Sequence, residues 1–165
     1  MSAPAKSARV ERAAAGLALA AVIGLLLLAL ATALDVLLRY VFASPIRGFV
    51  DIASLAGAVL LAACFPYVLV VRANISVDML GRRLGGAFKT ALDRFAALVT
   101  AAFFVLMAWQ YVRFALEMRE TAQVIPVLRW GVWPWWAGVA LFIVLAAAAA
   151  VLTAWQRQPE EADNE

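Results

Sequence analysis

Four long apolar segments, separated by short polar ones, dominate the hydropathy pattern of this chain. They lie at residues 13–38, 49–71, 91–112 and 133–155. The first contains an unbroken apolar run from Ala13 to Leu34, whose 22 residues would extend about 33 Å as a helix, enough to cross the hydrocarbon core of a bilayer. The third is the shortest, and its uncharged part, Phe95 to Val112, has 18 residues, the lower limit for a helix that spans a membrane. The pattern predicts an all-α membrane protein with four transmembrane helices.

Charged residues and a proline mark the connection between the first two segments. Asp35 and Arg39 lie four residues apart, so a helix places them on one face, where they can neutralise each other near the membrane interface. Pro45 ends the first helix, because the residue before a proline is pushed out of the α region. Asp51 falls in the first turn of the second helix, where a carboxylate suits the positive end of the helix dipole. Asp35 and Arg39 form either a structural ion pair or a contact with a partner subunit, and the sequence favours neither.

The connection between the second and third helices, residues 72–90, is polar but has an apolar side. Its large apolar residues fall within a narrow arc of a helical wheel; these are Val77, Leu80, Leu84 and Phe88. An amphipathic segment of this kind lies along the membrane surface. Gly81 and the pair Gly85-Gly86 weaken a long helix, so we expect one or two turns followed by a loop. The alternative is a plain solvated loop.

The stretch that joins the third and fourth segments is rich in charge and in aromatic rings. Arg113 and Glu117 lie four apart, so the third helix can continue into water until Pro126 stops it. Five tryptophans flank the fourth segment: Trp130, Trp133, Trp135, Trp136 and Trp155. The 19 residues from Trp136 to Trp155 correspond to about 28 Å of helix, close to one hydrocarbon thickness. We interpret these rings as two aromatic belts, the alternative being an aromatic substrate cage.

The distribution of lysine and arginine predicts the topology. With the N-terminus in the cytoplasm, the inner segments hold nine of the fourteen basic residues: Lys6, Arg9, Arg12, Arg72, Arg82, Arg83, Lys89, Arg94 and Arg157. The outer connections hold Arg39, Arg47, Arg113, Arg119 and Arg129. The positive-inside rule therefore places residues 1–12 and the tail, 156–165, in the cytoplasm, on either side of a transmembrane domain at 13–155. The alternative for the first segment is a cleaved signal peptide.

Composition excludes several classes of function. Apolar residues make up 66% of the chain and charged residues 15%, so a water-soluble core could not bury the apolar side chains. A net charge of only +3, spread along the chain, argues against nucleic-acid binding. Histidine is absent and Cys64 is the single cysteine, which removes bis-histidine haem, a cysteine or histidine zinc site and histidine-based catalysis.

The chain also lacks the residue sets of an active site. No nucleophile lies beside a base, no glycine-rich phosphate loop precedes a helix, and no metal-ligand spacing occurs. None of the four spans has an ionisable residue at its middle, where a pump or small exporter would place one. We therefore predict no catalytic residue, no cofactor and no metal, and a function carried out with a partner.

The order of these features resembles the small membrane subunit, of DctQ type, of tripartite ATP-independent periplasmic (TRAP) transporters. Three elements carry the resemblance: Arg39, Tyr40 and Phe42 at the end of the first helix, Pro45 and Asp51 before and in the second, and Ile75, Val77 and Asp78 after it. Pro126 and Trp130 resemble the proline-rich approach to the last span. Asn74 stands where the family commonly has histidine. The likeness covers residues 10 to 155.

This resemblance implies an inner-membrane complex with a large permease subunit and a periplasmic substrate-binding protein, driving uptake of organic acids with a sodium or proton gradient. The substrate and ion sites would belong to the large subunit, and this chain would enlarge the immobile scaffold. The residues expected at structural or partner contacts are Asp35, Arg39, Tyr40, Pro45, Asp51, Asn74 and Asp78. Two alternatives are a free-standing exporter or channel and the membrane anchor of a redox enzyme.

Overall fold

Four long helices make up the described part of the chain, which in this computed structural model comprises residues 3–43, 46–71, 86–125 and 129–156. They are α1 (Ala3–Phe42), α2 (Phe49–Val71), α4 (Gly86–Glu120) and α5 (Trp133–Gln156). Each contains a stretch long and apolar enough to cross a membrane. The all-α architecture with four spans is therefore confirmed.

The predicted spans lie within the helices, and two of the helices are longer than predicted. α2 has the predicted bounds and α5 continues one residue beyond them, to Gln156. α1 and α4 extend past both ends of their spans, α4 from Gly86 to Glu120, because flanking polar residues continue the helix outside the lipid. Residues 72–85, which hold most of the predicted amphipathic segment, lie outside the described residues, and 86–90 form the first turns of α4.

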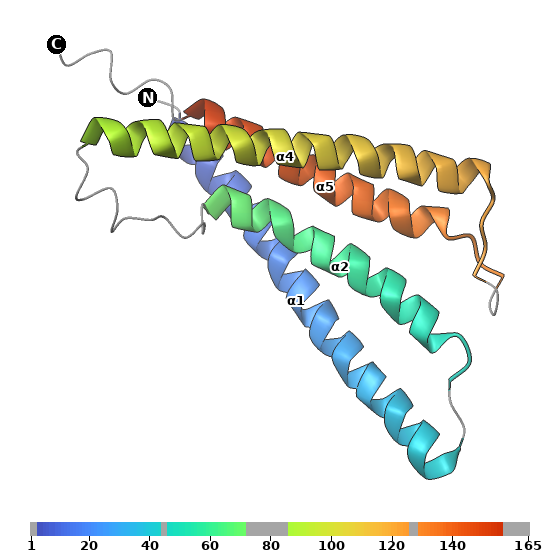
Figure 1. The fold of residues 1–165 in the computed structure, drawn as a ribbon. Coiled ribbons are helices and arrows are strands. Elements are labelled where there is room, and N and C mark those ends of the chain that lie inside the picture. Colours follow the sequence, from blue (N-terminus) through green and yellow to red (C-terminus); the bar gives the residue numbers. More distant parts are fainter. Residues whose placement is uncertain (1–2, 44–45, 72–85, 126–128, 157–165) are drawn as a thin grey trace.

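The helices are arranged as a row in the order α1, α2, α5, α4, and not as a closed bundle (Figure 1). α1 packs against α2, α2 also packs against α5, and α5 also packs against α4. Successive helices run in opposite directions, so the connections at 43–48 and 121–132 lie on the same side. The row fans out toward these connections, so the α1–α2 pair and the α4–α5 pair lie farther apart on that side than on the other. Among the described helices, the two outer ones, α1 and α4, therefore each pack along their length against one neighbour, α2 and α5 respectively.

α5 is the central helix of the core. In its most apolar 18-residue stretch, 33% of the residues are buried, against 11% in the corresponding stretches of α1 and α4. Its buried residues are mostly small: Val139, Ala140, Ile143, Ala146, Ala147, Ala149 and Ala150. Alanine lets neighbouring helices approach closely, which matters in lipid because association there depends on van der Waals packing. Phe65 of α2 and Phe104 of α4 meet edge to face with their ring centroids 5.7 Å apart, which closes this core over α5.

α1 joins the row through a stripe of mostly small residues that faces α2. Ala14, Ala18 and Ala21 are buried on this side. At Gly24, an added Cβ would lie 2.7 Å from Cδ2 of Leu60, closer than van der Waals contact allows. A side chain at Gly24 would therefore require Leu60 to change its conformation, and a large one would require α1 and α2 to move apart.

We expect Gly24→Leu to destabilise the α1–α2 pair by about 1–3 kcal/mol, the usual cost of overpacking a close contact. Gly16→Leu is the matched control, because a Cβ at Gly16 would meet nothing within 4 Å. Thermal unfolding of the purified protein in detergent measures both. Leu60→Ala should restore part of the stability lost in Gly24→Leu, and equal stability of the two glycine variants would contradict the close contact.

Candidate functional site

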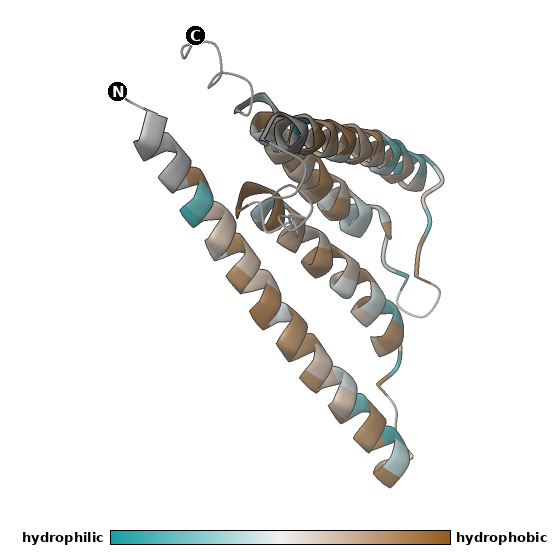
Figure 2. Ribbon diagram, turned by 60° about the vertical axis from the view of Figure 1, so that its left-hand side comes forward, coloured by the Kyte–Doolittle hydropathy of each residue, from teal (hydrophilic) through white to brown (hydrophobic). Residues whose placement is uncertain are grey.

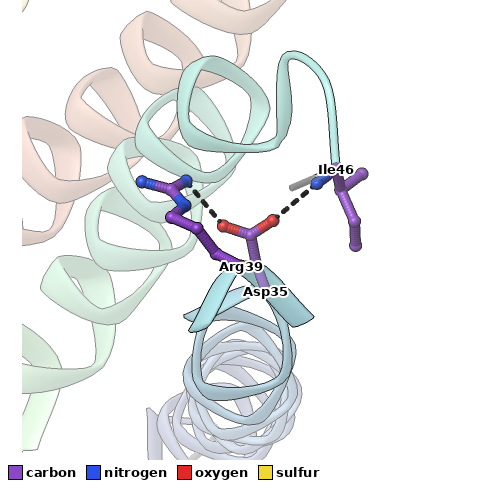
Figure 3. Close-up of polar contacts among 3 residues, drawn as sticks. All are labelled: Asp35, Arg39 and Ile46. Atoms are coloured by element: carbon purple, nitrogen blue, oxygen red, sulfur yellow. Dashed lines mark hydrogen bonds and ion pairs between the residues drawn. The ribbon is translucent and has the colours of Figure 1, made fainter. Parts of the chain in front are cut away.

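The buried carboxylate of Asp35, near the end of α1, forms hydrogen bonds within α1 and to the turn that precedes α2 (Figure 3). Asp35 is 2% exposed and is the only buried charged residue among those whose side-chain exposure is described. Its Oδ2 accepts a hydrogen bond from Nη2 of Arg39 at 2.9 Å, and its Oδ1 accepts one from the backbone N–H of Ile46 at 2.9 Å. Both carboxylate oxygens are therefore used within this chain.

The predicted pairing of Asp35 with Arg39 is present, and the two side chains differ sharply in environment. The side chain of Arg39 is 54% exposed, whereas that of Asp35 is 3% exposed. Helical spacing of four residues brings the guanidinium over the carboxylate. The bond to Ile46, eleven residues along the chain from Asp35, could not be predicted from helical spacing. We name these three residues, Asp35, Arg39 and Ile46, the Asp35 junction.

The turn after the junction is shaped by backbone conformation. Ala43 and Gly48 have positive φ values, 48° and 76°, which reverse the chain between the helices. Gly48 suits this conformation because it has no Cβ. Its carbonyl accepts the N–H of Ile52 at 3.2 Å, a bond of the first turn of α2. The Asp35 carboxylate thus holds the chain just before the helix begins.

Of the other predicted contact residues, those that the structure describes lie near the same end of the molecule as the Asp35 junction. Tyr40 is 92% exposed and Phe42 is also exposed, so both rings are largely free of packing against the described residues. Asp51 is half-buried in the first turn of α2, as predicted. Pro45, Asn74 and Asp78 lie outside the described residues. The contacts predicted for all of these residues stay predictions.

The second connection on this side, residues 121–132, contains a small hairpin. Val124 and Gly131 form an antiparallel bridge, and Ile125 donates its N–H to the carbonyl of Trp130 at 2.8 Å. Ile125 is buried, which anchors the hairpin to the helices. α4 ends at Glu120, before this hairpin and before Pro126. Sequence reasoning missed this hairpin, because a single bridge leaves no alternating pattern.

The tryptophans at the start of α5 have two different roles. Trp130 and Trp133 are exposed, as expected of an aromatic belt, and Trp133 also lies under the guanidinium of Arg119 at 5.7 Å. Trp136 instead packs between α4 and α5: it stacks on Tyr111 with centroids 6.3 Å apart and meets Phe114 edge to face at 4.8 Å. Trp136 therefore acts in helix packing, a contact that the belt interpretation did not include.

Large apolar side chains cover the outer sides of the row. Figure 2 shows hydrophobic residues along most of α1, with hydrophilic ones near its ends. The exposed large side chains of α1 include Leu19, Ile23, Leu26, Leu27, Leu30 and Leu34, and those of α4 include Phe95, Leu98, Phe103, Leu106 and Trp109. This surface suits lipid or the helices of another membrane protein.

The described residues hold no group of three or more histidine, cysteine or acidic side chains that could bind a metal ion. Cys64 is a free, half-buried thiol whose Sγ lies 3.6 Å from the carbonyl oxygen of Leu60. The described contacts of charged side chains therefore lie at the helix ends, in the Asp35 junction and beside the 121–132 hairpin.

Comparison with known protein families identifies a match. The family model described as "Tripartite ATP-independent periplasmic transporters, DctQ component" matches residues 28–159, which include the Asp35 junction and the three following helices. Comparisons with curated proteins and with solved structures found no match. Four apolar helices and a match over most of the length agree with the resemblance seen in the sequence. The chain is a multi-pass membrane protein of the DctQ family, the small permease component of TRAP transporters.

Proposed function

We propose that this subunit is a scaffold that transports nothing by itself and supports a large permease subunit. The large subunit would take up organic acids that a periplasmic binding protein delivers, driven by an ion gradient. The observation that carries the proposal is the single row of described helices, in which α1 and α4 each pack along one neighbouring helix and have wide exposed apolar faces. A row of this kind provides a large surface for a second membrane protein.

The positions of the charged groups support a role outside the transport pathway. Asp35, the buried charge of the described residues, lies near the end of α1 and is already neutralised by Arg39 and bonded to Ile46. Ion and substrate pathways in membranes are marked by ionisable groups that face a cavity or the interior of a bundle. A carboxylate used in a turn between two helices is a structural element.

The row would lie in the bacterial inner membrane with both termini in the cytoplasm. This orientation rests on the excess of lysine and arginine in the segments 1–12, 72–94 and 156–165. The Asp35 junction and the 121–132 hairpin would then face the periplasm, the side from which a binding protein delivers substrate. Tyr40 and Phe42, exposed beside the junction, would be available to the partner subunits.

Reconstitution tests the proposal directly. We expect vesicles that contain this chain alone to show no saturable uptake, while vesicles that also contain the large permease, supplied with the binding protein, accumulate substrate when an ion gradient is imposed. Omitting this chain from the second preparation should abolish most of that uptake. Saturable flux through the pure chain would instead indicate a free-standing exporter or channel, and co-purification with a soluble dehydrogenase would indicate a redox anchor.

A further inference from the structure

The hairpin at residues 121–132 exposes large apolar side chains although it lies outside the helices. Val124 is 51% exposed and Trp130 is 57% exposed, and the bridge between Val124 and Gly131 brings their backbones close together. Ile125, by contrast, is 3% exposed and fixes the hairpin to the rest of the chain. Positions 126–128 lie outside the described residues. Exposed apolar side chains that gather in one place mark a surface for a membrane or for another protein.

Backbone donors on both arms of the hairpin are hydrogen-bonded. Ile125 donates its N–H to the carbonyl of Trp130 at 2.8 Å, and Arg129 donates its N–H to the carbonyl of Ile125 at 2.8 Å. Val132 donates its N–H to the carbonyl of Gln123 at 2.9 Å. An unpaired backbone group is costly in lipid, because no water is present to replace the lost bond. These N–H groups can therefore enter the edge of the bilayer without that cost.

Its position and direction place the hairpin at the membrane surface. It leaves α4 at the end of one apolar stretch, 94–120, and enters α5 at the start of the next, 133–155. Figures 1 and 2 show its described parts turning aside from the axes of α4 and α5 instead of continuing along them. Trp133, the first residue of α5, is exposed at this level, as suits a tryptophan at the boundary between hydrocarbon and water. The exposed side chains of the hairpin are therefore within reach of the headgroup layer.

Arg129 adds a positive charge to this surface from an unfavourable backbone conformation. It is exposed and has a φ of 54°, in the left-handed region that glycine adopts without steric cost. A side chain kept at a strained position of this kind points to a use for that side chain. A guanidinium forms strong, geometrically defined hydrogen bonds with phosphate oxygens. Beside Val124 and Trp130, it needs a partner that offers negative charge and apolar surface together.

We propose that Val124, Arg129 and Trp130, which we name the hairpin face, bind the surface of the bilayer. The guanidinium would contact lipid phosphates, and the two apolar side chains would lie among the upper parts of the acyl chains. A phospholipid layer supplies both kinds of contact at this level, and the hairpin face then fixes the depth of the α4–α5 pair in the membrane. This inference needs neither the large permease nor a particular direction of insertion, so its failure would leave the proposed function unaffected.

Spin labels on the full-length chain measure the depth of the hairpin face. Cys64→Ala removes the single cysteine, after which Val124→Cys carries a nitroxide on the hairpin. In vesicles of equal parts dioleoylphosphatidylcholine and dioleoylphosphatidylglycerol, we expect oxygen, which dissolves in lipid, to relax this label more than a water-soluble nickel chelate does. Leu106→Cys, on the exposed side of α4, gives the value for lipid, and Glu120→Cys, at the end of that helix, gives the value for a polar surface.

Substitutions of Arg129 separate its charge from its backbone conformation. Arg129→Gln should shift the label at position 124 about fivefold toward water, judged by the ratio of the two relaxation effects, because an arginine near an anionic bilayer favours binding by that factor. The shift should be smaller in dioleoylphosphatidylcholine alone, and Arg129→Lys should keep most of the binding. Arg129→Gly also relieves the backbone, so it should lose lipid contact as Arg129→Gln does while its thermal stability in detergent is equal or higher.

Trp130→Ala should also move the label toward water, with Trp130→Phe affected less, and helix content by circular dichroism should be equal in all variants. Three results would overturn the proposal. Access of the nickel chelate to position 124 equal to that at position 120 would show that the hairpin lies in water. Unchanged depth in both Arg129→Gln and Arg129→Gly would show that the charge is not used. Loss of oxygen access when the large permease or the binding protein is added would show that a partner protein covers the hairpin face.

Discussion

Replacing Arg39 with methionine should lower the free energy of unfolding by about 3 kcal/mol, more than replacing the buried Asp35 with asparagine, for which we expect about 1 kcal/mol. The asymmetry follows from burial. Without Arg39, a carboxylate that is almost fully buried loses its counter-charge and keeps only the hydrogen bond from Ile46. In Asp35→Asn no buried charge remains, the amide oxygen can still accept from Ile46, and the half-exposed guanidinium of Arg39 can turn to water or headgroups.

Unfolding of the purified chain in mixed micelles measures both variants, and Arg47→Gln serves as a control because Arg47 is exposed in the same turn. The charge-swapped double variant, Asp35→Arg with Arg39→Asp, sharpens the test. It restores a pair of opposite charges but places no acceptor beside the N–H of Ile46, so we expect less than half of the lost stability to return. Full recovery would mean that the ion pair alone matters, and a smaller loss in Arg39→Met than in Asp35→Asn would reverse the argument.

The membrane spans could be predicted from hydropathy, and the start of α2 also has a local cause. The turn before α2 contains Pro45 and Gly48, and Asp51 then suits the first turn of the helix. Hydropathy over about 20 residues identified all four spans, since nearly every residue facing lipid must be apolar. The ion pair of Asp35 with Arg39 followed from helical spacing alone. Local rules were sufficient for these features.

The arrangement of the helices could not be predicted, because it depends on contacts between residues far apart in the chain. In lipid, all sides of a helix can be apolar, so hydropathy does not indicate which side faces a neighbour. Gly24 looks like any other small residue of α1 until Leu60 is placed opposite it. Likewise, Trp136 looks like one more belt residue in the sequence, whereas the structure places it against Tyr111 and Phe114.

The role of α5 as the central helix leads to a second large effect. We expect Ala146→Leu to destabilise the chain by about 3 kcal/mol and to lower transport by the assembled complex, because Ala146 is 0% exposed and belongs to the core cluster that α5 forms with α2 and α4. Three added carbons there must push a neighbouring helix away. Since α5 is the link between the α1–α2 pair and α4, that shift would separate the two halves of the scaffold.

Ala148→Leu is the matched control, since Ala148 lies two residues away on the exposed side of the same helix and carries the same chemical change. We expect its unfolding free energy to stay within about 0.5 kcal/mol of the parent, as is usual for surface substitutions. Unfolding in mixed micelles gives the stabilities, and uptake by vesicles containing the three TRAP components gives the functional effect. If both variants were equally stable, α5 would not be the packed centre of the row. If Ala146→Leu lost stability but kept full uptake, the spacing of the helix pairs would not matter for the scaffold.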